Sequence, residues 1–259
     1  KNFMSWYTKS NQYSREKLDG DIEKLRSFYL DSGYLEFTID SSQVSLSPDR
    51  TKVFISILIN EGDKFKVGKV TLAGDLLGQE KMLKEKILIK TSQTFSNLNL
   101  QKSTEIIRNR LGDFGYAFAR VTPIPNIDRE SKIVDFEINV NSGQRAYVRR
   151  IDISGNAKTR DEVIRREMRQ LESSWYDAEA INLSKSRIDR LGYFQSVEMS
   201  TSQVSGTKDQ VDIGIKVEER PLGSITAGVG FSSSENVVLT AGVSQQNFLG
   251  SGTNLSFQV

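Results

Sequence analysis

The sequence contains no cysteine and no histidine among its 259 residues. Without cysteine, the chain cannot form a disulfide, a thiolate nucleophile or a cysteine-ligated metal site. The lack of histidine removes the most common general base and the most common metal ligand. No Gly-rich phosphate loop or nucleophile elbow is present either. The residue types therefore argue against an enzyme and against a bound metal or cofactor.

Long apolar runs and a dominant charge are also missing. No stretch approaches the roughly 18 apolar residues that a membrane-spanning helix requires, and no signal-peptide pattern opens the chain. The 35 Lys and Arg residues nearly balance the 33 Asp and Glu residues, which leaves a net charge of +2. A nucleic-acid partner, which selects for a strongly basic surface, is therefore not expected.

What the chain does contain is a threefold internal repeat. A helix that ends in glycine beside an aromatic residue, followed by two strands, recurs with its glycine at Gly33, Gly115 and Gly192. Repeats of about eighty residues predict an array of similar small domains, and such arrays usually bind other molecules. The three glycines are expected to end helices, because glycine adopts a positive φ at little cost.

Each repeat has the element order β-α-α-β-β, which predicts an α+β fold with two helices on a three-stranded mixed sheet. We expect three such modules: residues 1–64 (the first module), 65–144 (the second module) and 145–220 (the third module). The first module lacks the opening strand of the pattern. We therefore expect the chain to be part of a longer protein.

Amphipathic spacing predicts which helical side chains are buried. In the first module these are Ile22, Leu25 and Phe28. In the third module a helix over 159–171 is expected to begin with a capping box between Thr159 and Glu162. The buried side of that helix is predicted to contain Val163, Ile164, Met168 and Leu171.

After Pro221 the helical pattern stops, and residues 222–259 alternate apolar with small polar side chains. Such alternation in segments of about ten residues is typical of strands in a transmembrane β-barrel. A water-soluble antiparallel sheet with one face on a core has the same pattern. Periodicity alone leaves both open, and residues 221–259 are expected to form about three antiparallel strands.

Several long stretches, in order and at consistent spacing, resemble the BamA family of outer-membrane protein assembly factors. They are LRSFYLDSGYLEFTIDSSQVSLSPD, VRRIDISGNAKTRDEVIRREMRQLESSW, DRLGYFQSVEMST and AGVSQQNFLGSGTNL. The resemblance implies that the three modules are the third, fourth and fifth polypeptide-transport-associated (POTRA) domains. It implies that residues 221–259 begin a transmembrane β-barrel. The location that follows is the outer membrane of a Gram-negative bacterium, with the POTRA domains in the periplasm.

The resemblance also implies a function without catalysis. In this family the POTRA array binds accessory lipoproteins and unfolded outer-membrane proteins, and feeds the latter to the barrel for folding and insertion. Open edges of small sheets suit that role, because unpaired N–H and C=O groups accept a further strand with little regard for side chains. We expect the first strand of each hairpin to offer such an edge, at residues 43–47, 120–122 and 196–199.

Two contacts with lipoproteins follow from the same resemblance. The edge of the first module is expected to bind the lipoprotein BamB, and its residues are Gln43, Val44, Ser45, Leu46 and Ser47. In the third module Arg165, Glu167 and Arg169 are expected to face water, and the resemblance assigns Glu167 to docking of the lipoprotein BamD.

The first barrel strand is expected to lie at the seam where the family's barrel closes. Glycines within a strand weaken its packing, so this strand is expected to form a loose edge that opens laterally toward client strands. The residues predicted to line the seam are Gly223, Ile225, Ala227, Val229 and Phe231.

Two other functions remain open at this point. One is a two-partner secretion or autotransporter assembly transporter of the same superfamily. The other is a purely periplasmic scaffold for protein interactions. The scaffold is less compatible with residues 222–259, because Ile225, Val229 and Phe231 would need a cover in water.

Overall fold

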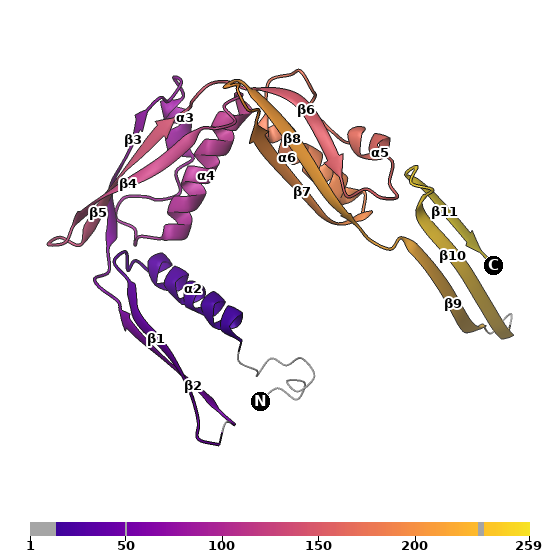
Figure 1. The fold of residues 1–259 in the computed structure, drawn as a ribbon, viewed down its shortest axis with the longest axis horizontal. Coiled ribbons are helices and arrows are strands. Elements are labelled where there is room, and N and C mark those ends of the chain that lie inside the picture. The colour runs from indigo at the N-terminus through magenta and orange to yellow at the C-terminus, as the bar shows by residue number, and fades with distance from the viewer. Residues whose placement is uncertain (1–13, 50, 233–235) are drawn as a thin grey trace. The chain divides into compact units, whose positions relative to one another are not determined.

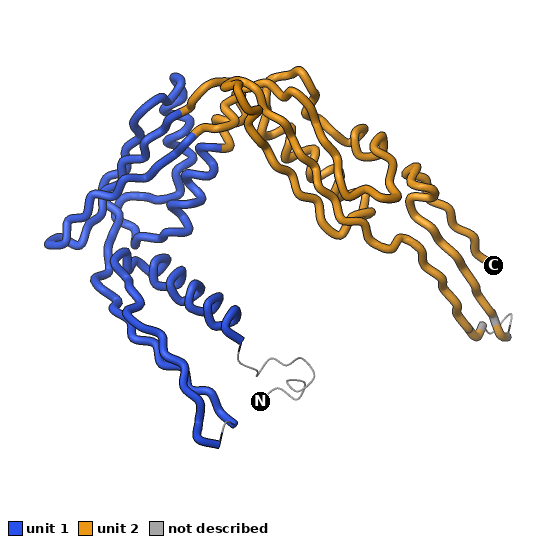
Figure 2. The backbone as a smooth tube through the Cα atoms, viewed as in Figure 1, with its two compact units in different colours: residues 1–108, 120–141 blue, residues 109–119, 142–259 orange. Residues whose placement is uncertain are grey.

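The computed structural model describes residues 14–49, 51–232 and 236–259. The chain separates into two compact units (Figure 2). Unit 1 contains residues 1–108 and 120–141, and unit 2 contains residues 109–119 and 142–259. Among the described helices, none combines the length and the apolar character needed to span a bilayer.

The first module begins with helix α2 (Arg15–Asp31), which is followed by strands β1 (Thr38–Leu46) and β2 (Val53–Asn60). The two strands pair antiparallel and form a two-stranded sheet. Ser14 caps the helix, because its side-chain oxygen accepts a hydrogen bond from the N–H of Lys17. Residues 1–13 of the predicted module lie outside the described residues.

One predicted core residue of the first module is wrong. Phe28 is 65% exposed, whereas Ile22 and Leu25 are half-buried. The aromatic side chain that faces the sheet is Tyr29, whose ring stacks on Phe37 with the ring centroids 4.3 Å apart. Adjacent helical positions differ by about 100°, so a contact made by Tyr29 turns Phe28 toward solvent.

The second module follows the predicted order. Its elements are β3 (Lys66–Gly74), α3 (Glu80–Glu85), α4 (Asn97–Asp113), β4 (Arg120–Asp128) and β5 (Ile133–Asn141). The strand order is β3-β5-β4, with β3 parallel and β4 antiparallel to β5. Apolar side chains from the sheet and the chain before α4, among them Phe95 and Phe136, form a buried cluster. Figure 1 shows α3 and α4 on one side of this sheet.

The third module repeats this topology. Its elements are β6 (Tyr147–Ser154), α5 (Asp161–Arg165), α6 (Ala178–Arg190), β7 (Phe194–Gln203) and β8 (Gln210–Glu219). The strand order is β6-β8-β7, again with a parallel and an antiparallel pair. The predicted mixed sheets are thus confirmed. The three marker glycines have φ values of 103°, 99° and 70°, which confirms their place after helix ends.

The start and length of α5 differ from the prediction. The residue before the helix is Arg160, which makes no side-chain cap, so the proposed capping box is absent. Thr159 is buried, and its N–H donates to Glu219 Oε1 at 2.7 Å. Because α5 ends at Arg165, the helical period does not extend to Leu171, and that side chain is exposed instead of buried.

Residues after the third module form three antiparallel strands, as the alternation predicts. They are β9 (Gly223–Ser232), β10 (Asn236–Phe248) and β11 (Thr253–Gln258), in the order β11-β10-β9. Ile225 lies opposite Val243, which lies opposite Phe257, so the apolar side chains share one face.

The turn between β10 and β11 is attached to the third module beside the start of α5. The Asn247 side chain is only 6% exposed, and its Nδ2 donates to Thr159 Oγ1 at 2.8 Å. Its Oδ1 accepts the N–H of Gly252 at 2.7 Å. The N–H of Arg160 donates to the carbonyl of Gly250 at 3.0 Å. A Cβ on Gly250 would lie 2.0 Å from a backbone oxygen of the third module, so no larger residue fits there.

We predict that Asn247→Gly loosens this attachment while keeping the positive φ of the position, which is 52°. Both side-chain hydrogen bonds of Asn247 are lost, the buried one to Thr159 and the partly buried one from Gly252, and each is worth about 0.5–1.5 kcal/mol. The amide of Arg160 should then exchange with solvent about tenfold faster or more in hydrogen-exchange measurements. Gln258→Ala, on the exposed surface of β11, serves as the control. Unchanged exchange at Arg160 would contradict the prediction.

Candidate partner-binding surfaces

Each three-stranded sheet of the second and third modules has two edge strands whose outward backbone groups must bond to water, to the same chain or to a partner. The edges are β3 and β4 in the second module, and β6 and β7 in the third. In the first module, β1 and β2 are both edges, since among the described residues they pair only with each other. These edges differ in how far the chain itself already satisfies them.

Strand β4 carries two prolines, Pro123 and Pro125, opposite Ile138 and Phe136 of β5. Proline has no N–H, and within a sheet it is accommodated where its nitrogen points away from the neighbouring strand. The outward side of β4 therefore lacks donors at two successive outward positions. The predicted edge at residues 120–122 directly precedes this interruption, which restricts any added strand to its first residues.

The β6 edge is partly covered by the chain's own backbone. The N–H of Val148 donates to the carbonyl of Ser174 at 2.9 Å, and the N–H of Ser173 donates to the carbonyl of Val148 at 2.7 Å. Tyr147 and Trp175 form a bridge beside this contact, with their rings stacked at a centroid distance of 4.2 Å. The first half of β6 is therefore not available to another strand.

Two side chains form hydrogen bonds with the next outward-facing backbone groups of β6, which are those of Ile151. The N–H of Ile151 donates to Glu172 Oε1 at 2.7 Å, and Arg165 Nη2 donates to the carbonyl of Ile151 at 2.9 Å. Arg165 and Glu172 also form an ion pair, with Nη1 and Oε1 3.4 Å apart. Together they occupy the backbone groups that an added strand would use. The guanidinium of Arg165 is thus engaged at the sheet edge, while its side chain is still 45% exposed to water, as expected.

Glu167 is also less free than predicted. Its side chain is 16% exposed, and its Oε2 lies 2.8 Å from Arg187 Nη2 on α6. Its Oε1 lies 3.6 Å from Arg166 Nε. The Nε of Arg187 is buried without a hydrogen-bond partner. An open cavity of about 230 Å³ lies here, lined by Glu167, Arg187, Arg190 and Leu191.

Arg169 is exposed and donates from Nη1 to the carbonyl of Met168 at 3.1 Å. The three charged residues that we predicted as one outward surface therefore engage different parts of the module. Arg165 bonds to the β6 edge, and Glu167 pairs with Arg187 of α6. The side chain of Arg169 is exposed, while its backbone N–H donates to Ser184 Oγ on α6 at 2.8 Å. The early end of α5 explains this, because these residues do not share one helical face.

The predicted edge of the first module is exposed. Gln43, Val44, Ser45 and Leu46 lie in β1, and Ser47 lies in the turn that follows. Val44 is opposite Ile55 and Leu46 is opposite Val53. All four of these apolar side chains are exposed, so they form a continuous apolar strip along the hairpin.

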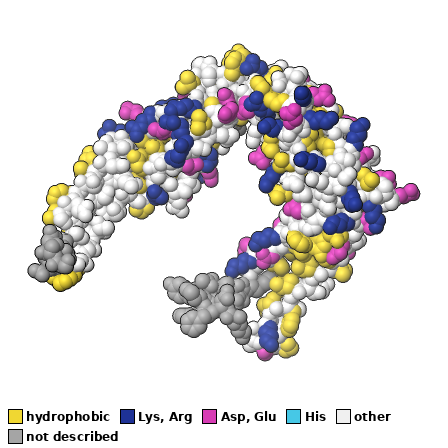
Figure 3. Space-filling model, turned by 180° about the vertical axis from the view of Figure 1, so that it is seen from behind, with side chains coloured by type: hydrophobic (Ala, Val, Ile, Leu, Met, Phe, Trp, Pro, Cys, Tyr) yellow, Lys and Arg dark blue, Asp and Glu magenta, His cyan; other side chains and the backbone are white. Residues whose placement is uncertain are grey.

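The predicted seam residues all lie on β9, which is an edge strand of its sheet. Ile225, Val229 and Phe231 are 84%, 79% and 81% exposed. Residues 223–259 contain a single charged residue, Glu235. Figure 3 shows this arm of the chain with almost no charged side chains. An apolar surface of this kind usually marks contact with lipid or with another protein.

Comparisons with known proteins agree with this arrangement. A POTRA family model, described as surface antigen variable number repeat, matches residues 3–62, 65–143 and 146–220. The chain belongs to the POTRA family. It is 37% identical over 255 residues to the outer membrane protein assembly factor BamA of Neisseria meningitidis. That match covers 98% of this chain and 32% of the Neisseria protein. The chain is 29% identical to BamA of Buchnera aphidicola over 99% of this chain and 42% of that protein.

Solved structures place the chain within the same family. A crystal structure of POTRA3–5 of Haemophilus influenzae BamA matches with a TM-score of 0.76 and 31% identity, over 81% of this chain and 83% of that one. BamA from Haemophilus ducreyi lacking POTRA domains 1–3 matches with a TM-score of 0.64 and 38% identity, over 75% of this chain and 37% of that one. The predicted BamA resemblance and POTRA fold are confirmed. The chain spans about a third of the length of the Neisseria protein.

We predict that Glu167→Lys destabilises the third module. The substitution places a third cation beside Arg166 and Arg187. Because the Glu167 site is partly buried, the loss in unfolding free energy should lie between that for an exposed and that for a fully buried ion pair, at about 1–3 kcal/mol. The double variant Glu167→Lys/Arg187→Glu restores opposite charges and should recover most of the loss. Denaturant titration measures both, and equal stability of wild type and Glu167→Lys would refute the prediction.

Proposed function

We propose that the chain is the POTRA3–5 region and the first barrel strands of a central component of the outer-membrane β-barrel assembly machinery. The observation that carries this proposal is the match to BamA proteins over nearly all of the chain, including the residues beyond the last module. The modules then lie in the periplasm, and the protein acts as a binding scaffold and insertase without chemistry of its own.

The exposed apolar face of β9–β11 supports the membrane part of the proposal. On this face apolar residues oppose one another across the strands, as Val229 and Leu239 do. The other face carries small polar residues such as Thr226 and Thr240. Outward apolar and inward polar side chains are the arrangement of outer-membrane barrel strands. β9 is an open edge containing Gly223, Gly228 and Gly230, which suits a seam that opens to admit client strands.

Two surfaces are proposed for accessory lipoproteins. The apolar strip at Val44 and Leu46 on the open β1 edge suits docking of BamB by strand addition. The Glu167 cavity between α5 and α6 suits docking of BamD. There, the partly exposed guanidinium of Arg187 and the exposed Arg190 can donate to a carboxylate from the partner, while Glu167 can bind a cation.

For BamD docking, we predict that Glu167→Lys weakens the affinity of the full-length protein for the lipoprotein at least about tenfold, because a close charge pair across an interface is reversed. The variant Glu167→Lys/Arg187→Glu, in which the internal ion pair is restored, should remain weak. Glu105→Lys on the exposed side of α4 controls for the change of charge. Wild-type affinity of the double variant would show that Glu167 acts through stability alone.

For the membrane strands, we predict that Leu239→Lys lowers the fraction of full-length protein that folds into lipid vesicles. A lysine on the lipid face of a barrel costs about 2–4 kcal/mol near the bilayer midplane. Thr240→Lys, on the opposite face of the same strand, should fold nearly as the wild type. Folded and unfolded bands on unheated gels measure the fraction. Equal losses for both variants would argue against a lipid-facing surface.

A further inference from the structure

The corresponding sheet edges of the second and third modules, β3 and β6, differ in how far the chain's own groups cover them. Val67 in β3 bonds to Ser92 and Gln93 as Val148 in β6 bonds to Ser173 and Ser174. Both strands then contain an irregularity in their pairing with the central strand. The first half of each edge is therefore covered in the same way.

The next outward position distinguishes the two modules. After the irregularity, Val70 pairs with Phe136 as Ile151 pairs with Ile213, so Val70 is the counterpart of Ile151. The backbone of Ile151 is closed by Arg165 and Glu172. In the second module Lys84 and Thr91 occupy the corresponding places. Among the described residues, no side chain or separate segment is hydrogen-bonded to the backbone of Val70.

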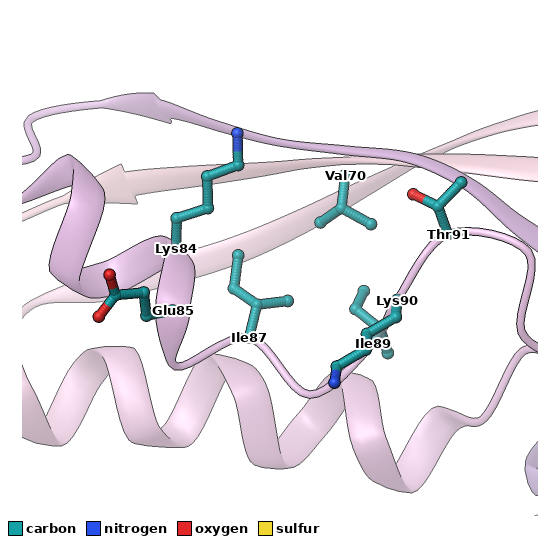
Figure 4. Close-up of a pocket in the computed structure, with 7 residues that line it drawn as sticks. All are labelled: Val70, Lys84, Glu85, Ile87, Ile89, Lys90 and Thr91. Atoms are coloured by element: carbon teal, nitrogen blue, oxygen red, sulfur yellow. The ribbon is translucent and has the colours of Figure 1, made fainter.

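A cavity of about 370 Å³ lies at the place in the second module that corresponds to Arg165 and Glu172 in the third. Its lining consists of Val70, Lys84, Glu85, Ile87, Ile89, Lys90 and Thr91. Figure 4 shows Lys84 reaching from the end of α3 toward β3, with Ile87 and Val70 pointing into the space between them. Glu85 points away from it. The floor of the cavity is therefore apolar, and a lysine stands at its rim.

The surrounding charge is positive. The segment 80–90, EKMLKEKILIK, contains four lysines and two glutamates, whereas the corresponding segment 161–171 of the third module balances three acidic with three basic residues. Lys84 makes no ion pair with any described residue. A ligand at this edge is therefore expected to bring apolar side chains and a carboxylate.

We propose that the β3 edge at Val70 and Leu72, together with this cavity, binds one short extended segment of an unfolded polypeptide by strand addition. The segment brings apolar side chains onto Ile87 and Ile89 and an acidic side chain to Lys84. Backbone bonds supply affinity, and alternate side chains entering the cavity supply selection. This inference rests on the proposed function and names which edge of the array receives the client. The third module is closed at the same place.

The test uses the full-length protein in detergent and a nine-residue probe peptide, Ser-Val-Ser-Val-Ser-Asp-Ser-Val-Ser. We expect the probe to slow amide exchange at Leu72 at least about tenfold at saturation, since that N–H gains a partner. The variant Lys84→Arg/Thr91→Glu transfers the closing pair of the third module into the second. It should abolish the protection at Leu72, while the amide of Val67, which bonds to Gln93, stays protected and shows that the module is folded.

Controls separate the parts of the proposal. Arg165→Lys/Glu172→Thr changes the third module instead and should leave the protection at Leu72 unchanged. A probe with lysine in place of aspartate should bind at least about tenfold more weakly, because it meets Lys84. A probe with methylated backbone nitrogens should not protect Leu72. No protection by the unmodified probe, or protection that survives Lys84→Arg/Thr91→Glu, would overturn the inference.

Failure of this inference can be told apart from failure of the proposed function. The same full-length protein is placed in lipid vesicles and supplied with an unfolded outer-membrane protein. If the client folds but the probe leaves Leu72 unprotected, the β3 site is refuted and the assembly function stands. If no client folds, the proposed function itself is refuted.

Discussion

The structure depends on how the backbone groups at the rims of small sheets are satisfied. A three-stranded sheet has a single inner strand, so most of its strands are edges, and an unsatisfied edge invites pairing with any passing strand. In this chain each edge strand has its outward backbone groups satisfied, or left exposed, in a different way. β4 loses donors at Pro123 and Pro125, and β6 is covered by its own chain and by Arg165 and Glu172. Within the part of the chain that the structure describes, no further strand pairs with the outer edges of β1 and β9. The proposed role as a scaffold for other polypeptides requires this selectivity, since uniformly open edges would also pair with one another.

The short helix α5 shows how neighbouring surfaces are held in place. A helix of five residues is not stable by itself. Its start is fixed by the bond of Thr159 to Glu219 and by the turn between β10 and β11, through Asn247. Just beyond its end, Glu167 pairs with Arg187 of α6. The attachment of the C-terminal strands and the proposed lipoprotein site therefore lie at opposite ends of the same small element.

Local patterns in the sequence predicted much of this fold. The glycines after the helices were predictable because a positive φ selects for glycine, and the alternation beyond residue 221 was predictable because adjacent strand residues face opposite ways. Errors arose where an element was shorter or rotated relative to its periodic pattern. Tyr29, and not Phe28, makes the inward contact of α2 by stacking on Phe37, and Leu171 lies beyond the actual end of α5. The two prolines of β4 were visible in the sequence, and the structure places them opposite Phe136 and Ile138, next to the edge expected at residues 120–122.

The sequence by itself determined the repeat, the α+β modules, the alternating strands and the BamA resemblance, because these depend on residues close together in the chain. Only the tertiary structure decided which edges are open and which charges are free. Glu172 meets Ile151 from 21 residues away, and Asn247 meets Thr159 from 88 residues away. Such contacts leave no periodic trace in the sequence, since they depend on how the strands and loops are brought together in three dimensions.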